Sequence, residues 1–282
     1  MKRRGVFISI ALFACASAGV WGFVVEPDLL LTRTIEVESR RWPPDRAPLR
    51  VAVVGDLHVG APHIDLAKVD EIVDRVNALR PDLVVLLGDY VIHRVTFGSF
   101  VAPEPTAERL GRLSAPLGVI SVLGNHDWWY DGKRVWRALE TAGIAVLENR
   151  ALRLRTEDGP LWIAGLADDT TRSPDARGTL AAVPDDEPAI VLAHDPVSFL
   201  DVPWRVVMTL AAHTHGGQVY VPFFGAPFIP GRAPRRFAYG LISEDDKDMY
   251  VTSGIGTSIV SVRFNMPPEI ALVTIRPAAG AD

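Results

Sequence analysis

Cysteine is almost missing from this chain of 282 residues, which contains only Cys15, inside an N-terminal apolar stretch. One cysteine cannot form a disulfide within a single chain, and it leaves no thiolate elsewhere in the sequence. Zinc sites built from cysteine and reactions with a cysteine nucleophile are therefore excluded outside that stretch.

An excess of basic residues is also absent, because 34 acidic residues outnumber 29 lysines and arginines and give a net charge of −5. Proteins that bind duplex nucleic acid carry a basic face that neutralises phosphates. We therefore expect no binding to nucleic acid duplexes. Hydrophobic residues make up 48% of the chain, which is enough for a sizeable core.

The N-terminus combines a basic start with a long apolar run. Lys-Arg-Arg at 2–4 precedes an uncharged stretch over 5–25, which is long enough to cross a bilayer as a helix. Small residues at Ala14, Ala16 and Ala18 also fit a signal-peptidase site. Both interpretations stay open: a membrane anchor that is retained, or a signal peptide that is removed.

The charges around this stretch favour one side of the membrane only weakly, because Arg33, Arg40 and Arg41 follow it closely. With the basic start, we place the rest of the chain at the cell membrane or outside the cytoplasm, in the periplasm or cell envelope. The alternative is a cytoplasmic-facing attachment in which the arginines hold the domain against the inner leaflet.

Short apolar runs predict strands, and helical spacing of apolar residues predicts helices over 66–79 and 132–142. Five strands are each followed at once by a polar motif: Leu49–Val54, Leu83–Leu87, Leu117–Leu123, Ile190–Ala193 and Val206–Ala211. Further strands are predicted near the C-terminus at Val219–Val221, Phe237–Ile242, Met249–Thr252 and Ile270–Ile275. This pattern favours two sheets packed face to face with helices outside.

The segments divide the chain into three parts. Residues 1–25 form the signal peptide or anchor, residues 26–48 a connector, and residues 49–277 one domain.

Five of the seven histidines lie in four short motifs, GDLHVG at 55–60, GNHD at 124–127, AHD at 193–195 and AHTHGGQ at 212–218, and LLGDY at 86–90 adds an aspartate. In open α/β sheets, ligands gather beyond the carboxyl ends of strands. Carboxylate, amide and imidazole groups at these ends suit two divalent metals. The candidate ligands are Asp56, His58, Asp89, Asn125, His194, His213 and His215.

Each motif alone also fits a simple turn, but their joint presence favours a metal site. Asp56 and His58 share one tight loop, and Asp89 is a lone carboxylate that suits a bridge between two ions. His213 and His215 are two residues apart, so on an extended segment they point the same way.

The series GDLH, GDY, GNHD, AHD and HTHGG resembles the signature of the calcineurin-like metallophosphoesterase superfamily, in the same order and over Leu49 to Ile275. The segments GNHDWW, HTHGGQ and SGIGTSIVSVRFNMPPEI are most similar to its bacterial envelope-associated phosphodiesterase branch. The resemblance implies a four-layer αββα sandwich, preceded here by a transmembrane or signal helix, with a dimetal site at the strand ends.

The resemblance also implies which residues bind each metal. The first metal would be held by Asp56, His58 and His215. The second would be held by Asn125, His194 and His213, with Asp89 bridging. Mn²⁺, Zn²⁺ and iron all suit this ligand mixture.

His126 matches the family's catalytic histidine, which can stabilise charge on the phosphate or protonate the leaving alkoxide. Asp127 follows in the position that can orient it. Ala212 departs from the family, which usually has glycine there, and its methyl group is expected to crowd the turn before His213.

We therefore predict a dimetal-dependent hydrolase of phosphate esters, foremost a phosphodiesterase that acts at the cell envelope through a metal-bridging hydroxide. The substrate is a phosphate ester, with a lipid-linked ester as one candidate. One alternative is a pyrophosphatase for a nucleotide-diphosphate lipid precursor such as UDP-diacylglucosamine, which the apolar loop Pro222–Pro230 would suit. Another is a metal-free scaffold, against which the full ligand set argues. The sequence indicates no oligomeric state.

Four further features have either two possible roles or no assigned role. The aromatic run at 128–130 forms either a substrate wall or packing between helix and sheet. Arg263 binds either a distal phosphate or a structural ion-pair partner. His63 and His93 match no ligand position and are expected in loops.

Overall fold

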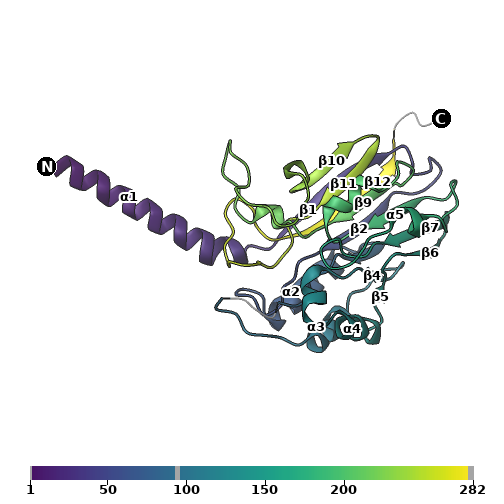
Figure 1. Ribbon diagram of the computed structural model, residues 1–282, viewed down its shortest axis with the longest axis horizontal. Helices are drawn as coiled ribbons and strands as arrows, with labels where there is room; N and C mark the ends of the chain where they lie inside the picture. The colour runs from purple at the N-terminus through teal and green to yellow at the C-terminus, as the bar shows by residue number, and fades with distance from the viewer. Residues whose placement is uncertain (1, 93–95, 279–282) are drawn as a thin grey trace.

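The computed structural model describes residues 2–92 and 96–278, and its strands form two six-stranded sheets (Figure 1). In order across the first sheet lie β1 (Leu31–Ser39), β12 (Glu269–Pro277), β2 (Leu49–Val54), β3 (Leu83–Leu86), β4 (Val119–Ser121) and β5 (Ala145–Val146). In order across the second lie β10 (Gly240–Glu244), β11 (Lys247–Val251), β9 (Met208–Ala211), β8 (Ala189–Leu192), β7 (Gly159–Gly165) and β6 (Arg150–Thr156).

The central strands are mostly apolar because both of their faces are covered. In β2, Val51 and Val53 belong to the core between the two sheets, whereas Ala52 and Val54 belong to the core beneath the helices. Successive side chains of a strand point to opposite faces, so a strand buried on both sides is apolar at nearly every position.

Helices form the two outer layers. On the first sheet lie α2 (Leu66–Ala78), α3 (Pro103–Leu110) and α4 (Asn125–Thr141), whose apolar residues share one core with β2 and β3. On the second sheet, α5 (Ala176–Leu180) packs with β7 and β8 in a separate core. The predicted αββα sandwich is therefore confirmed.

Several elements differ from the sequence expectation. Residues 26–48, expected to form a connector, contain β1, which pairs in parallel with β12 at the edge of the first sheet. The hairpin of β6 and β7 was not expected; apolar and polar residues alternate along β6, whereas β7 is a short apolar segment that begins with Gly-Pro. Residues 219–221 form only isolated bridges, to Phe264 and Gly225, in place of a strand.

Helix α4 begins earlier than the expected 132–142, because the GNHD motif itself forms its first turn. Gly124 precedes the helix in an extended conformation, and Asp131 breaks the helical geometry farther along. The motif therefore lies at a helix N-terminus that follows β4.

The N-terminal apolar segment projects from one end of the domain as α1 (Lys2–Val20) (Figure 1). It continues into a short π-helix, η1 (Trp21–Val25), and a 3₁₀ helix, η2 (Glu26–Asp28). Residues Val6–Asp28 are long and apolar enough to cross a membrane, and 6% of the segment is buried. Its far end is held by the domain: the Arg263 N–H donates to the Gly22 carbonyl at 2.9 Å, and the Met266 N–H to Glu26 Oε1 at 2.6 Å.

A buried carboxylate ties the two sheets together near this end. Glu269, at the start of β12, is fully buried and pairs with Arg33 of β1 at 2.9 Å. It also accepts hydrogen bonds from the hydroxyl groups of Tyr250 at 2.7 Å, on β11 of the second sheet, and Tyr239 at 2.8 Å. A buried charge is tolerated only with such partners.

Replacing Glu269 with alanine should therefore destabilise the fold strongly, because Arg33 and two tyrosines lose their acceptor. We expect Glu269→Ala to lower the free energy of unfolding by about 3 kcal/mol or more, measured by chemical denaturation of the full chain in detergent. Glu38→Ala is the control: Glu38 pairs with Arg276 across the same two strands, but half-exposed, so its loss should cost less than about 1 kcal/mol. Equal costs for both variants would contradict this role.

Candidate metal centre

Five strand ends converge on one place in the fold. β2, β3 and β4 run in parallel within the first sheet, and β8 and β9 run in parallel within the second. Each carries its motif immediately beyond its carboxyl end, where loops of parallel strands can meet. These loops bring together the side chains expected to bind metal: Asp56, His58, Asp89, Asn125, His194, His213 and His215.

The donor atoms form overlapping clusters. Asp56, His58 and His215 make one group, and Asp89, His194 and His213 make another, with the ligand atoms of each group within 4.8 Å of one another. A third group joins His58, Asp89 and His126. Every member except half-buried His126 is buried.

Asp89 lies between the two groups. Its Oδ2 atom is 3.6 Å from His58 Nε2 and 3.3 Å from His194 Nε2. Asn125 adds an amide oxygen 3.1 Å from His194 Nε2, and His213 Nδ1 lies 3.1 Å from the same atom. One carboxylate thus faces histidines of both clusters.

The residues present suit divalent cations. Burial lowers the pKa of His58 to about 3 and that of His215 well below its ordinary value, so both rings are neutral, as metal binding requires. Their Nε2 atoms face each other at 3.1 Å. Carboxylate, amide and imidazole donors together match the preferences of Mn²⁺, Zn²⁺ and iron.

The electrostatics of the site favour positive charge beside its carboxylates. Burial raises the pKa of Asp56 to about 7. Burial alone would lower the pKa of His194, but the carboxylates of Asp89, Asp56 and Asp168 together outweigh it, and the pKa lies well above the ordinary value. A cation between such groups favours their ionised forms.

Five of these residues adopt left-handed backbone conformations that side chains other than glycine rarely take. The φ angles are 51° at Asp56, 46° at His58, 57° at Asp89, 70° at His213 and 52° at His215. Such strain persists where surrounding structure fixes it, and it is concentrated at functional sites.

Groups around the clusters fix the orientation of the ligands. His194 Nδ1 lies 2.7 Å from the Leu87 carbonyl, and the Asp56 carboxylate accepts the His213 N–H at 3.0 Å. Asp195 Oδ2 lies 3.6 Å from His213 Nε2, on the opposite side of the ring from the cluster. A partner on the second ring nitrogen sets the tautomer of a ligating histidine. Sequence analysis did not identify Asp195, although it belongs to the AHD motif.

Asp127 binds the backbone of the neighbouring motif. Its oxygens accept N–H groups of Asp89 at 2.8 Å, Tyr90 at 2.9 Å and Gly124 at 2.9 Å. Burial raises the pKa of Asp127 to about 7, while these three donors favour its charged form. The Asp89 side chain explains the glycine at position 124, because a Cβ atom there would lie 2.2 Å from Asp89 Oδ1.

The methyl group of Ala212 is accommodated without crowding. Ala212 is fully buried beside Gly55, where an added Cβ atom would lie only 2.8 Å from the Ala212 methyl. The missing side chain at Gly55 therefore leaves the space that Ala212 fills, and His213 remains in the cluster.

His126 lies at the open side of the clusters. Its ring centroid is 4.7 Å from that of His58 and 4.8 Å from that of Trp129, and its Nε2 atom is 3.4 Å from Ser258 Oγ. The aromatic run is divided: Trp128 and Tyr130 pack against the core, whereas Trp129 is 55% exposed beside His126.

Arg263 has a structural role. It is fully buried, and its guanidinium donates to the carbonyl oxygens of Ser253, Gly254, Gly256 and Met266 at 2.6–3.2 Å. The guanidinium therefore holds the loop after β11 together. His63 Nε2 lies 3.0 Å from the Phe23 carbonyl at the end of the apolar segment, and His93 lies outside the described residues.

A buried His/Asp site at the strand ends of an αββα sandwich defines a metal-dependent phosphoesterase. The chain belongs to the calcineurin-like phosphoesterase family, whose model matches residues 49–223. It is 30% identical to "Uncharacterized metallophosphoesterase YkuE" of Bacillus subtilis, covering 98% of each chain, and 30% identical to "Phosphodiesterase YaeI" of Escherichia coli, covering 81% of this chain and 83% of the relative. "Transmembrane protein with metallophosphoesterase domain" of Danio rerio is 29% identical, covering 95% of this chain and 62% of the relative.

The position of Asp195 leads to a prediction about metal affinity. Asp195→Ala should weaken metal binding about 10- to 100-fold, because His213 loses the partner that orients its ring. Titration of the metal-free full chain with Mn²⁺ measures the affinity. Asp201→Ala is the control: Asp195 and Asp201 flank the short 3₁₀ helix Pro196–Leu200, and Asp201 is exposed. Unchanged affinity in Asp195→Ala would rule out this orienting role.

Proposed function

We propose that this protein is a phosphodiesterase that uses two divalent metal ions at the cell envelope. The observation that carries the proposal is the position of Asp89, whose carboxylate faces His58 of one cluster and His194 of the other. A shared carboxylate between two donor groups is what a dinuclear site requires. The printed name of the Escherichia coli relative, a phosphodiesterase, supports the same reaction.

The two clusters divide the ligands between the ions, with Asp89 shared. One ion would be held by Asp56, His58 and His215. The other would be held by Asn125, His194 and His213. When bound, Mn²⁺, Zn²⁺ or iron supplies Lewis acidity, which activates water and offsets negative charge on the phosphate.

His126 is the proposed catalytic side chain. It is half-buried at the open side of the clusters, where its imidazole reaches a bound ester and can stabilise charge on phosphorus or protonate the leaving alkoxide. Asp127 does not act on the ester directly. Because it binds the backbone N–H groups of Asp89 and Gly124, we assign it the positioning of the LLGDY and GNHD motifs.

The apolar N-terminal segment associates the protein with the membrane, and the Danio rerio relative is named as a transmembrane protein. We propose that residues 1–25 form a retained anchor, because Gly22 and Glu26 are buried against the domain. We place the domain spanning 49–277 outside the cytoplasm, in line with the basic start of the chain.

The different roles of His126 and Asp89 give paired predictions. His126→Ala should keep its metal and lose about 100- to 10,000-fold in turnover, the range for removal of a general acid. Asp89→Ala should lose metal and turnover together, because both clusters depend on its carboxylate. Elemental analysis and hydrolysis of bis-p-nitrophenyl phosphate with Mn²⁺ measure both quantities.

Wild-type turnover by His126→Ala at saturating metal would exclude a catalytic role for His126. Full metal content in Asp89→Ala would exclude Asp89 as the bridging ligand. A wild-type chain that binds no metal would instead support the metal-free scaffold.

A pyrophosphatase for a nucleotide-diphosphate lipid is the second candidate. The observation that favours it is the loop Pro222–Pro230, on which Phe223 and Phe224 are exposed to solvent. A cytoplasmic-facing domain would suit this substrate class. Release of a nucleoside monophosphate from UDP-diacylglucosamine, with no hydrolysis of simple diesters, would favour this candidate over the first.

A further inference from the structure

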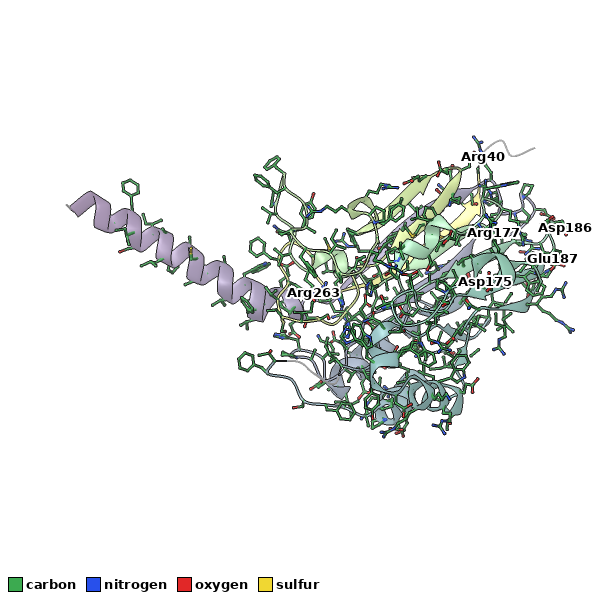
Figure 2. The ribbon with its side chains drawn as sticks, viewed as in Figure 1. Arg40, Asp175, Arg177, Asp186, Glu187 and Arg263 are labelled. Atoms are coloured by element: carbon green, nitrogen blue, oxygen red, sulfur yellow. The ribbon has the colours of Figure 1, made fainter. Side chains whose placement is uncertain are left out.

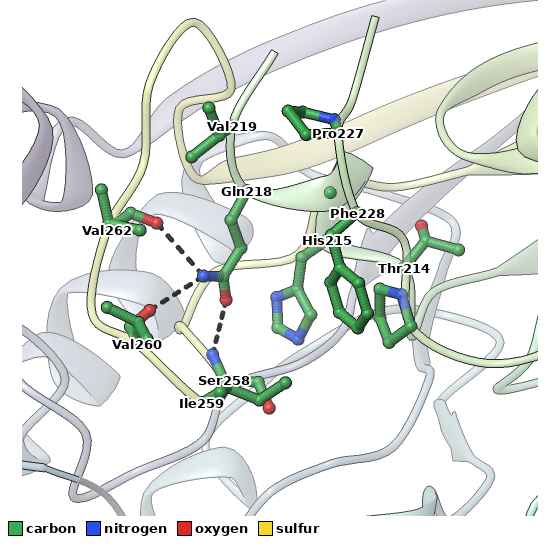
Figure 3. A pocket seen from close by; sticks show the side chains of 12 residues that line it. Thr214, His215, Gln218, Val219, Pro227, Phe228, Ser258, Ile259, Val260 and Val262 are labelled. Carbon is green, nitrogen blue, oxygen red and sulfur yellow. Dashed lines mark hydrogen bonds between the residues drawn. The ribbon is translucent and has the colours of Figure 1, made fainter.

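An apolar cavity of about 460 Å³ opens beside the metal-ligand clusters (Figure 3). His215, a member of the first cluster, lines it. The remaining wall is mostly apolar and comes from two loops, one over 219–230 and one over 258–262. The side chains that form it include Val219, Phe228, Ile259, Val260 and Val262.

Gln218 fixes the second loop in place. Its amide nitrogen donates to the carbonyl oxygens of Val260 at 2.9 Å and Val262 at 3.2 Å, and its Oε1 atom accepts the Ser258 N–H at 2.6 Å (Figure 3). These bonds satisfy backbone polar groups of the loop from inside the protein. The cavity is therefore preformed and presents hydrocarbon side chains.

The same two loops expose large apolar side chains to solvent. Phe223 is fully exposed, Phe224 is 80% exposed, and Phe228 and Ile259 are each at least 60% exposed. Exposed apolar residues gathered in one place mark a surface that contacts a partner or a membrane.

The position of the apolar segment identifies the membrane as that partner. The end of the segment is hydrogen-bonded to Arg263 and Met266, directly after the loop that walls the cavity. Figure 2 shows Arg263 at the end of the domain that α1 enters, with the charged residues Arg40, Asp186 and Glu187 at the opposite end. A bilayer crossed by α1 therefore faces the end of the domain that carries the cavity.

We propose that the cavity binds the apolar chain of an amphiphilic phosphate ester, whose phosphate lies on the metal clusters. The proposal rests on the phosphodiesterase function and names its substrate class. His215 connects the two regions, because it borders the cavity and belongs to the first cluster. A chain in the cavity would leave the phosphate next to the metals and the rest of the lipid toward the membrane.

Two diesters that differ only in chain length test the proposal. In p-nitrophenyl methyl phosphate and p-nitrophenyl octyl phosphate the same ester bond breaks and the same nitrophenol is released. The full chain is assayed with Mn²⁺ in phosphatidylcholine nanodiscs, so that partitioning of the octyl ester is equal for all variants. Differences in KM between variants then come from the protein and not from partitioning of the ester.

Phe228→Ser and Val260→Asn make the cavity polar without adding charge near the phosphate. Each should raise KM for the octyl ester about 5- to 10-fold, as expected for the loss of one to two buried methylene contacts, and leave the methyl ester unchanged. Phe223→Ser is the matched control, since Phe223 lies on the same exposed apolar surface but is not part of the cavity wall. It measures the effect of weaker membrane contact alone, and it should raise KM for the octyl ester less than either cavity variant does. An equal rise in all three variants would overturn the proposal.

Each result has one meaning. If both cavity variants hydrolyse the octyl ester with wild-type KM, or affect both esters equally, the cavity does not hold the chain and the proposal is overturned. In that case continued hydrolysis of the methyl ester by wild type leaves the phosphodiesterase function intact. Failure of wild type to hydrolyse either ester would overturn that function itself.

Discussion

The burial of carboxylates and histidines in one small, shared space is the constraint on which this structure depends. Asp56 and Asp89 are almost completely buried, and buried charges are stable only with partners of opposite charge. The neutral rings of His58 and His215 provide no such charge, whereas the neighbouring carboxylates raise the pKa of His194 and so favour its charged form. Metal cations bound among these donors would supply further positive charge, and the donor types suit them.

The loops that carry these groups hold one another in place. Asp56 of the first motif accepts the backbone N–H of His213, and Asp127 accepts that of Asp89. His194 bonds to the carbonyl of Leu87. The loops after β3 and β9 are thus bound by side chains from other loops, so the left-handed conformations of Asp89 and His213 are fixed by the surrounding assembly. The strands behind them, apolar on both faces, supply the rigidity that local sequence does not.

How much the sequence revealed depended on where each residue's partners lie. The strand Leu49–Val54 was predicted with its observed bounds because burial on both faces leaves an apolar run that only Arg50 interrupts. The edge strand β1 was missed because its exposed positions are polar. The candidate ligands were found because each follows a strand directly. The contact of Asp195 with His213 could not be predicted, because it depends on how two loops approach in space. Arg263 was ambiguous for the same reason, since the carbonyl groups that bind it come from an irregular loop.

The junction between the apolar segment and the domain links membrane attachment to the site. Glu26 binds the Met266 backbone, and a Cβ atom at Gly216, next to His215, would lie 2.4 Å from the Met266 sulfur. Met266 therefore contacts both Glu26, at the end of the apolar segment, and Gly216, the residue next to the candidate metal ligand His215. An amphiphile that leaves a bilayer completely loses about 0.8 kcal/mol for each methylene group exposed to water. A cavity that opens beside the anchor removes most of that cost, because the chain can pass from lipid to protein while its phosphate moves onto the clusters.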